Sequence, residues 1–271
     1  MGSTPCRPVG APLWSAGARR QGFLGGRRKG RNAERPKSVN HESLARFEAE
    51  DLTCVRGGRR VFTGLSLSLG SGGALLLHGP NGTGKSSLLR ILAGLLRPAG
   101  GRLLWNGTAV RDDPESHRAR LHYVGHLDSL KPLMTPAETL TFFAATRAKP
   151  ANAAAALAAF DLADLADLPG RYLSAGQKRR TALSRLIASP APLWLLDEPT
   201  VTLDVESTAQ LERLMAAHRA EGGMVIVATH TGIALEGAER LDLRAFQVGR
   251  RATPDSPGQV AATPDFEDET W

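Results

Sequence analysis

The chain has 271 residues, 42% of them hydrophobic, so it can bury a substantial core and global disorder is excluded. Its formal charge of +7 is confined to one segment, because residues 1–45 hold nine Lys or Arg against two acids and the remainder holds 25 of each. Two cysteines, Cys6 and Cys54, are too few for a disulfide framework or a thiolate metal site, and no apolar run approaches the roughly 18 residues that a membrane-spanning helix needs.

The two ends of the chain are predicted to be disordered. Residues 1–45 are rich in Gly, Arg, Pro and Ser without apolar periodicity, which indicates a basic leader. Arg19 and Arg20 are not followed by an apolar segment, which excludes a secretory signal. A mitochondrial transit peptide, an inert tail and upstream sequence translated from a wrongly assigned start remain open for this leader. Residues 250–271 are predicted to be an acidic tail, so the folded domain is expected at 46–249.

Short strand patterns and one helix come first in the folded part. Residues 65–69 alternate Leu with Ser, which indicates a half-buried strand, and the apolar run within 73–78 suits a fully buried one. Residues 102–106 and 121–124 are further strand candidates. A helix is predicted after Lys85, because apolar residues recur there at spacings of three and four, at Leu88, Ile91, Leu92 and Leu95.

The middle of the chain is predicted to be helical. A capping box at 135–138, with proline at the first helical position, opens a helix that runs to Arg147. Acidic and apolar residues repeat within 161–168, which favours an amphipathic helix with a solvated acidic face over a metal site. Two more buried strands are expected at 193–196 and 224–229.

A phosphate-binding motif follows the strand predicted at 73–78. It has two glycines separated by four residues and then Lys and Ser. The glycines let backbone N–H groups curl around phosphates, and the next helix directs its N-terminal amides at the same anion. Lys85 supplies a positive charge and Ser86 a hydroxyl that can bind Mg²⁺. A glycine-rich turn without a ligand is disfavoured by the strand and helix on either side. The motif consists of Gly79, Pro80, Asn81, Gly82, Thr83, Gly84, Lys85 and Ser86.

Two acids, Asp197 and Glu198, come directly after the apolar run at 193–196. In phosphoryl transfer a carboxylate at the end of a strand holds the hydrated Mg²⁺ ion, and a second carboxylate can orient the attacking water. Neighbouring side chains point in different directions, so one acid is expected to hold the metal and the other to orient the water. Taken alone, the pair would be an ordinary exit from a strand into a loop, and the phosphate loop about 110 residues earlier favours the functional interpretation.

A third motif lies between these two. Its small residues precede a helix that is expected to turn Leu183, Leu186 and Ile187 inward, and a helix N-terminus is a second anion-binding surface. The alternatives are a plain helix cap for the motif and a solvated face for the basic run 178–180. The residues of the motif are Leu173, Ser174, Ala175, Gly176 and Gln177.

The order of these motifs over roughly 47–249 resembles that of the ATP-binding subunits of ABC transporters. The resemblance implies an α/β fold of the P-loop NTPase class: an ABC-type ATPase domain with a mainly parallel core sheet, an antiparallel β subdomain and a helical subdomain at about 128–190. It identifies 173–177 as the signature, Asp204 as the end of the D-loop and His230 as the switch histidine that stabilises the γ-phosphate.

The same resemblance implies ATP and Mg²⁺ as cofactors and a homodimer as the working unit. Each ATP would lie between the phosphate loop of one subunit, extended to Ser87 and Arg56, and Ser174 and Gly176 of the other. Glu198, His230 and Lys85 would be catalytic, and Ser86 and Asp197 would bind the metal. The partners implied are integral membrane permease subunits, with no nucleic acid expected.

The segment 125–138 narrows the resemblance to the haem-exporter ATP-binding subunits of cytochrome c maturation. In those proteins a histidine commonly replaces the Q-loop glutamine, and His126 takes that position here. This implies ATP hydrolysis in haem export or delivery at the cytoplasmic face of the bacterial inner membrane, with the mitochondrial inner membrane as an alternative. Two other functions stay open: the ATPase of another small-molecule or lipid exporter, and a soluble ABC-type ATPase acting on nucleic acid or ribosomes.

Four positions depart from the wider family pattern. Arg56 replaces an aromatic residue that stacks on adenine, although a guanidinium can also stack on a ring. Ala175 replaces a signature glycine. Val201 removes a D-loop hydroxyl from the expected subunit seam, and His126 cannot bind magnesium as a glutamine carbonyl would.

Overall fold

The structure is a computed structural model that describes residues 45–126, 130–147, 150–230 and 232–247. Except for Ala45, the predicted leader and tail lie outside these residues. In chain order the strands and α-helices are β1 (Arg46–Arg56), β2 (Arg59–Gly70), β3 (Ala74–His78), α1 (Lys85–Leu92), β4 (Gly100–Trp105), β5 (Thr108–Ala109), α2 (Pro114–Ala119), β6 (Leu121–Val124), α3 (Pro136–Ala145), α4 (Ala153–Ala158), α5 (Ala175–Ala188), β7 (Leu193–Asp197), α6 (Val205–Ala220), β8 (Met224–Ala228) and β9 (Glu239–Asp242).

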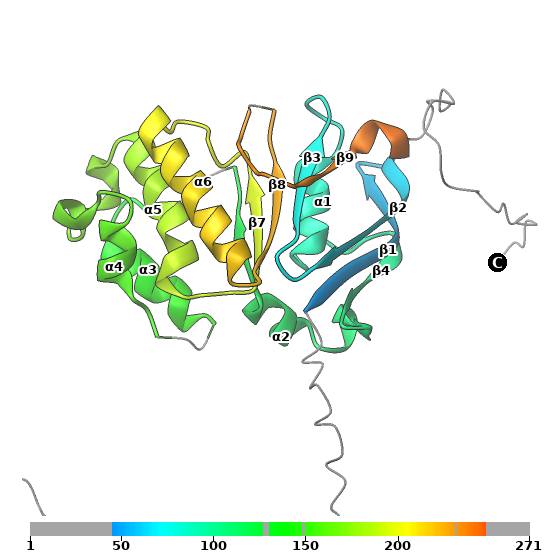
Figure 1. The fold of residues 1–271 in the computed structure, drawn as a ribbon, viewed down its shortest axis with the longest axis horizontal. Helices are drawn as coiled ribbons and strands as arrows, with labels where there is room; N and C mark the ends of the chain where they lie inside the picture. Colours follow the sequence, from blue (N-terminus) through cyan, green and yellow to red (C-terminus); the bar gives the residue numbers. More distant parts are fainter. Residues whose placement is uncertain (1–44, 127–129, 148–149, 231, 248–271) are drawn as a thin grey trace, which may run out of the picture. The chain divides into compact units, whose positions relative to one another are not determined.

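A parallel sheet with the strand order β6-β7-β8-β3-β9 lies at the centre of the described domain (Figure 1). Its register places Leu77 of β3 opposite Ala228 of β8, and Asp197 of β7 opposite the same alanine. The carboxyl ends of β3, β7 and β8 therefore meet at one edge of the sheet. Ligands of open α/β sheets bind at this edge, and the three strands lead there into the phosphate loop, Glu198 and His230.

An antiparallel sheet with the order β2-β1-β4-β5 covers one face of the parallel sheet, with α1 in the shared core (Figure 1). Alternate residues of the buried strands face opposite sides, as the pleat requires. Leu75 and Leu77 of β3 pack toward α1 and the antiparallel sheet, whereas Leu76 packs into the other core. The expected mainly parallel sheet and antiparallel β subdomain are both confirmed.

Helices α3, α4, α5 and α6 cover the opposite face (Figure 1). Helix α3 begins with the predicted capping box, in which the Thr135 hydroxyl accepts from Glu138 N–H and the Glu138 carboxylate accepts from Thr135 N–H. In α5, Leu183 and Leu186 are buried as predicted. Among the described residues, no helix combines the length and the apolar character needed to cross a membrane.

Two predicted helices differ from the structure. The helix after Lys85 ends at Leu92, so Leu95 does not share its buried face and is 59% exposed. The cause is Gly94, whose φ of +68° turns the chain and lets its N–H bond to the carbonyl of Ile91. Within 161–168 the structure has only a short 3₁₀ helix, Ala163–Leu165. Asp161 has a φ of +53°, which is incompatible with an α-helix through this residue.

Candidate functional site

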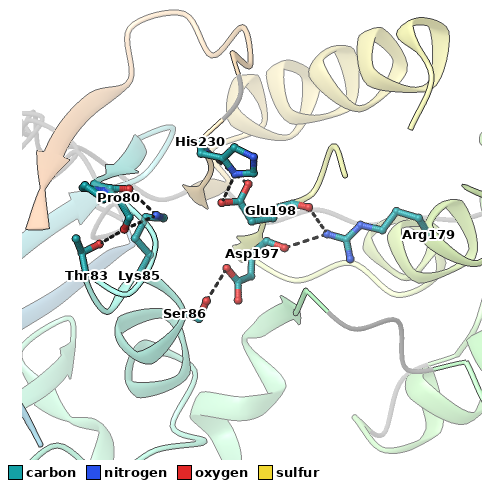
Figure 2. A network of polar contacts seen from close by, with 9 residues as sticks. Pro80, Thr83, Lys85, Ser86, Arg179, Asp197, Glu198 and His230 are labelled. Atoms are coloured by element: carbon teal, nitrogen blue, oxygen red, sulfur yellow. Dashed lines mark hydrogen bonds and ion pairs between the residues drawn. The ribbon is translucent and has the colours of Figure 1, made fainter. Parts of the chain in front are cut away.

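The phosphate loop joins β3 to α1 and is shaped by internal hydrogen bonds. The Lys85 ammonium donates to the carbonyl oxygens of Gly79 at 2.6 Å and Pro80 at 3.2 Å, and the Thr83 hydroxyl donates to Pro80 at 2.8 Å (Figure 2). Gly84 is the N-cap of α1 with a φ of +102°, a conformation that favours glycine. The loop therefore places a lysine and the N-terminal amides of a helix around one point, as a phosphate site requires.

Ser86 and Asp197 meet where α1 begins and β7 ends. The Ser86 hydroxyl donates to Asp197 Oδ1 at 3.1 Å (Figure 2). Asp197 is buried, and its Oδ2 has no hydrogen-bond partner among the described residues. Burial raises the pKa of Asp197, and the hydrogen bond from Ser86 opposes this rise. A carboxylate oxygen without a partner beside a hydroxyl fits Mg²⁺, which takes few protein ligands and completes its shell with phosphate oxygens and water.

Glu198 and His230 form the adjacent polar pair. Glu198 Oε1 lies 2.9 Å from His230 Nδ1, and the His230 backbone N–H donates to Oε2 at 3.3 Å (Figure 2). Glu198 has a φ of +48°, the left-handed region that residues with a Cβ rarely adopt. With this backbone the carboxylate contacts His230, two residues after the end of β8.

One cleft of about 540 Å³ brings most of the predicted residues together. Val61 of β2 also lines it, although no sequence pattern marked this residue. Gly79, Pro80 and Thr83 support the loop from outside the cleft lining. The predicted residues in the cleft are Arg56, Asn81, Gly82, Gly84, Lys85, Ser86, Ser87, His126, Asp197, Glu198 and His230.

The signature and the D-loop residue do not line this cleft. Ser174 is the N-cap of α5, with its hydroxyl accepting from Gln177 N–H and its own N–H donating to the Gln177 side chain. Asp204 is the N-cap of α6, and its hydrogen bonds with Ser207 lower the pKa of its carboxyl. Ser174, Ala175 and Asp204 are exposed, so another chain can reach them, while Leu173 is buried.

The sequence left open a solvated face for the basic run 178–180, but Arg179 is buried. It is 2% exposed, and its guanidinium donates to backbone carbonyls at the ends of β6 and β7. Arg179, Leu183 and Leu186 recur at spacings of four and three, so this arginine belongs to the buried face of α5. That spacing is the sequence signal that marks it.

Comparisons with known proteins identify the family of the chain. A family model described as ABC transporter matches residues 62–201, slightly more than half of the chain. The chain is 58% identical over 207 residues to the cytochrome c biogenesis ATP-binding export protein CcmA of Paramagnetospirillum magneticum, covering 74% of this chain and 95% of that protein. A protein of the same name from Rhodospirillum rubrum is 60% identical over 206 residues, or 76% of this chain and 88% of that protein. The chain belongs to the CcmA family of ABC transporters.

The solved structures show the same fold. An ABC transporter ATP-binding protein from Pyrococcus furiosus matches with a TM-score of 0.64 and 20% identity, covering 75% of this chain and all of that one. For this CcmA-family chain, the expected ABC-type ATPase fold is therefore confirmed. Family membership also implies that the chain binds ATP, as ABC transporter domains do.

Proposed function

We propose that the chain is the ATP-hydrolysing subunit of an ABC export complex that serves c-type cytochrome biogenesis, with haem as the class of cargo exported or delivered. The observation that carries the proposal is the meeting of the phosphate loop, Asp197, Glu198 and His230 in one cleft of a chain with 58% identity to a cytochrome c biogenesis export protein. The similarity of residues 125–138 to haem-exporter subunits supports haem as the cargo.

Binding of the nucleotide begins at the phosphate loop. The N-terminal amides of α1 and the ammonium of Lys85 face the position of the phosphates, and Lys85 exchanges its bonds to Gly79 and Pro80 for bonds to phosphate oxygens. Arg56 and Val61 line the same cleft on the side of the antiparallel sheet, where they contact the adenine. A guanidinium face and an apolar side chain would replace the aromatic stacking of the wider ABC transporter pattern.

Hydrolysis uses the pair at the ends of β7 and β8. Glu198 accepts a hydrogen bond from the attacking water, and His230 exchanges its contact with Glu198 for one with a γ-phosphate oxygen. Ser86 and Asp197 would hold a Mg²⁺ ion, which would supply positive charge against the charge that develops on the phosphate oxygens. Glu198 and His230 follow the adjacent strands β7 and β8, so the order of the strands brings them close together.

A homodimer completes the site. The signature residues lie outside the cleft of their own chain, and exposed Ser174 caps the N-terminus of α5, which attracts anions. In the dimer, Ser174 and Gly176 of one subunit face the ATP of the other, so closure depends on ATP and opening on hydrolysis. The chain would lie at the cytoplasmic face of the bacterial inner membrane. There, closure and opening of the dimer would drive integral membrane permease subunits. The relatives reported above come from Paramagnetospirillum and Rhodospirillum, which favours this location over mitochondria.

The test is complementation of a strain that lacks the gene. Wild type and the control Glu239→Gln, an exposed residue of β9, should restore haem-stained c-type cytochromes. Glu198→Gln should bind ATP but fail to hydrolyse it and fail to restore them. Normal cytochromes without the gene would refute the role in cytochrome c biogenesis.

The membrane proteins that co-purify with the chain separate the other functions. Cytochrome c maturation subunits would support the proposal. A permease unrelated to haem would instead indicate another exporter. Salt-sensitive binding of nucleic acid by residues 46–271 would indicate a soluble ABC-type ATPase, which the balanced charge of this region does not favour.

A further inference from the structure

Arg179 lies in α5, two residues after the signature, and among the residues that the structure describes it is the largest fully buried side chain. Its neighbour Arg180 is only partly buried and donates to the carbonyl of Phe160, in the helical part of the domain. Arg179 instead points toward the carboxyl edge of the parallel sheet (Figure 2). A charged side chain buried to this extent requires fixed hydrogen-bond acceptors around it.

The acceptors are backbone carbonyls of two separate segments. In the segment after β7, Nη2 donates to Asp197 at 2.9 Å and to Glu198 at 2.7 Å, and Nε donates to Pro199 at 3.1 Å. In the segment after β6, Nη1 donates to Gly125 at 2.7 Å. A planar guanidinium can serve all four acceptors at once, which the single nitrogen of a lysine cannot do.

These bonds fix a backbone that is otherwise unfavourable. Glu198 has a left-handed φ of +48°, and such a conformation persists only where the surroundings determine it. Its N–H donates to Ala228 of β8 at 2.8 Å, and its carbonyl accepts from Arg179. The peptide groups on both sides of the residue are thus held, and its carboxylate faces His230.

The fourth acceptor connects this segment with the residues that follow β6. Gly125 directly precedes His126, which lines the cleft and begins the connection to the helical part. One guanidinium therefore joins the backbone that carries Glu198 to the backbone that carries His126.

We propose that Arg179 is a positioning residue for ATP hydrolysis, which holds the left-handed backbone of Glu198 and ties it to the segment of Gly125 and His126. The proposal rests on the ATPase function proposed above. Arg179 lines no part of the nucleotide cleft, so it acts on the orientation of Glu198 and not on the affinity for ATP.

The test separates turnover from binding in the purified full-length chain. Arg179→Gln is expected to lower kcat by about a hundredfold, because misplacement of a reacting group by about 1 Å has an effect of this size. KM and the Kd of a fluorescent ATP analogue should change little. Arg179→Lys should retain only a small part of the rate. Arg213→Gln is the matched control, since Arg213 is exposed on α6 and bonds only to Gln210 among the described residues.

A double variant tests the route of the effect. In the Glu198→Gln background, Arg179→Gln should lower the residual turnover no further, because the side chain that it positions is already inactive. ATP-driven dimerisation of the double variant should match that of Glu198→Gln.

Three outcomes would overturn the proposal: a wild-type kcat for Arg179→Lys, a parallel loss of kcat and ATP affinity, or an additive effect in the double variant. Circular dichroism establishes whether Arg179→Gln folds, and Arg179→Lys carries the test if it does not. Absence of ATP turnover by the wild-type chain would refute the proposed function itself, whereas normal turnover by the Arg179 variants would refute only this inference.

Discussion

His230 Nδ1 lies 2.9 Å from Glu198 Oε1, and this polar contact connects the segment after β7 with the segment after β8 in the candidate cleft. Glu198 follows β7 and His230 follows β8, so the order of the strands brings them together from positions 32 residues apart. The Glu198 side chain is 12% exposed and that of His230 is 54% exposed. The carboxylate is therefore held in place, whereas the imidazole has room to change its partner.

This pair predicts a specific defect for His230→Ala. The variant should lose a group that contacts the γ-phosphate, and kcat should fall by about a hundredfold or more. ATP affinity should be nearly unchanged, because the phosphate loop and Lys85 are intact. Steady-state ATPase rates and titration with a fluorescent ATP analogue measure the two effects. Wild-type turnover in His230→Ala would show that the histidine has only a structural role at the strand end.

The buried carboxylate of Asp197 predicts a gain of stability on neutralisation. Burial raises its pKa, so the charged form destabilises the ATP-free fold, and the penalty grows as pH rises from the unfolded pKa of about 4 through the higher folded value. Asp197→Asn should raise Tm at neutral pH without Mg²⁺ and nucleotide, and this gain should disappear toward pH of about 4. The Tm of both proteins is measured by thermal unfolding, followed by circular dichroism, at a series of pH values from neutral down to about 4.

Asp242→Asn is the control for this prediction and has the opposite sign. The hydrogen bond from Arg244 lowers the pKa of Asp242, so its charged form stabilises the fold above the unfolded pKa. Its replacement should lower Tm at neutral pH, with the loss vanishing in acid. A Tm for Asp197→Asn that equals wild type across the whole range would contradict the unfavourable burial of Asp197.

The elements that bring the candidate site together could be predicted, because each motif is continuous in the sequence and the strand patterns around it are clear. The strand expected at 121–124 is β6 without a shift, and 193–196 differs from β7 by one residue. Strand β1 is less evident, because its buried residues change phase at Asp51, where φ is +49° and the pairing register shifts. A single bulge of this kind interrupts the alternation on which strand prediction depends.

Other features depend on backbone turns and distant contacts that the spacing of apolar residues does not show. Gly94 ends α1 before Leu95, although the apolar spacing continues. The role of Arg179 depends on carbonyls 18 to 54 residues away, so the basic run alone suggested solvent. Val61 reaches the cleft only because β2 packs beside the phosphate loop. The two are so close that a Cβ added to Gly84 would lie 2.5 Å from Val61 Cγ1.

The close packing of Gly84 against Val61 predicts that the phosphate loop has no room for a side chain at this position. Gly84→Ala would combine a φ of +102° with a collision against Val61, and we expect a loss of unfolding free energy of about 2–4 kcal/mol together with loss of ATP binding. Gly82→Ala is the matched control for stability. It has a φ of +82° but no atom within 4 Å of the added methyl group, so the expected loss is about 1–2 kcal/mol. Urea denaturation compares them, and equal losses would contradict the steric argument.

Ser174 allows the helix cap to be separated from the proposed contact with a second subunit. Ser174→Asp keeps an N-cap oxygen for Gln177 N–H, so the stability of the fold should be retained, whereas Ser174→Ala should cost about 1 kcal/mol. In the proposed homodimer, however, the aspartate would face the γ-phosphate of the partner's ATP and repel it. Ser174→Asp should therefore abolish ATP-driven dimerisation in the Glu198→Gln background, as measured by light scattering. If Ser174 were only a helix cap, Ser174→Asp would dimerise like its parent and Ser174→Ala would be the weaker variant.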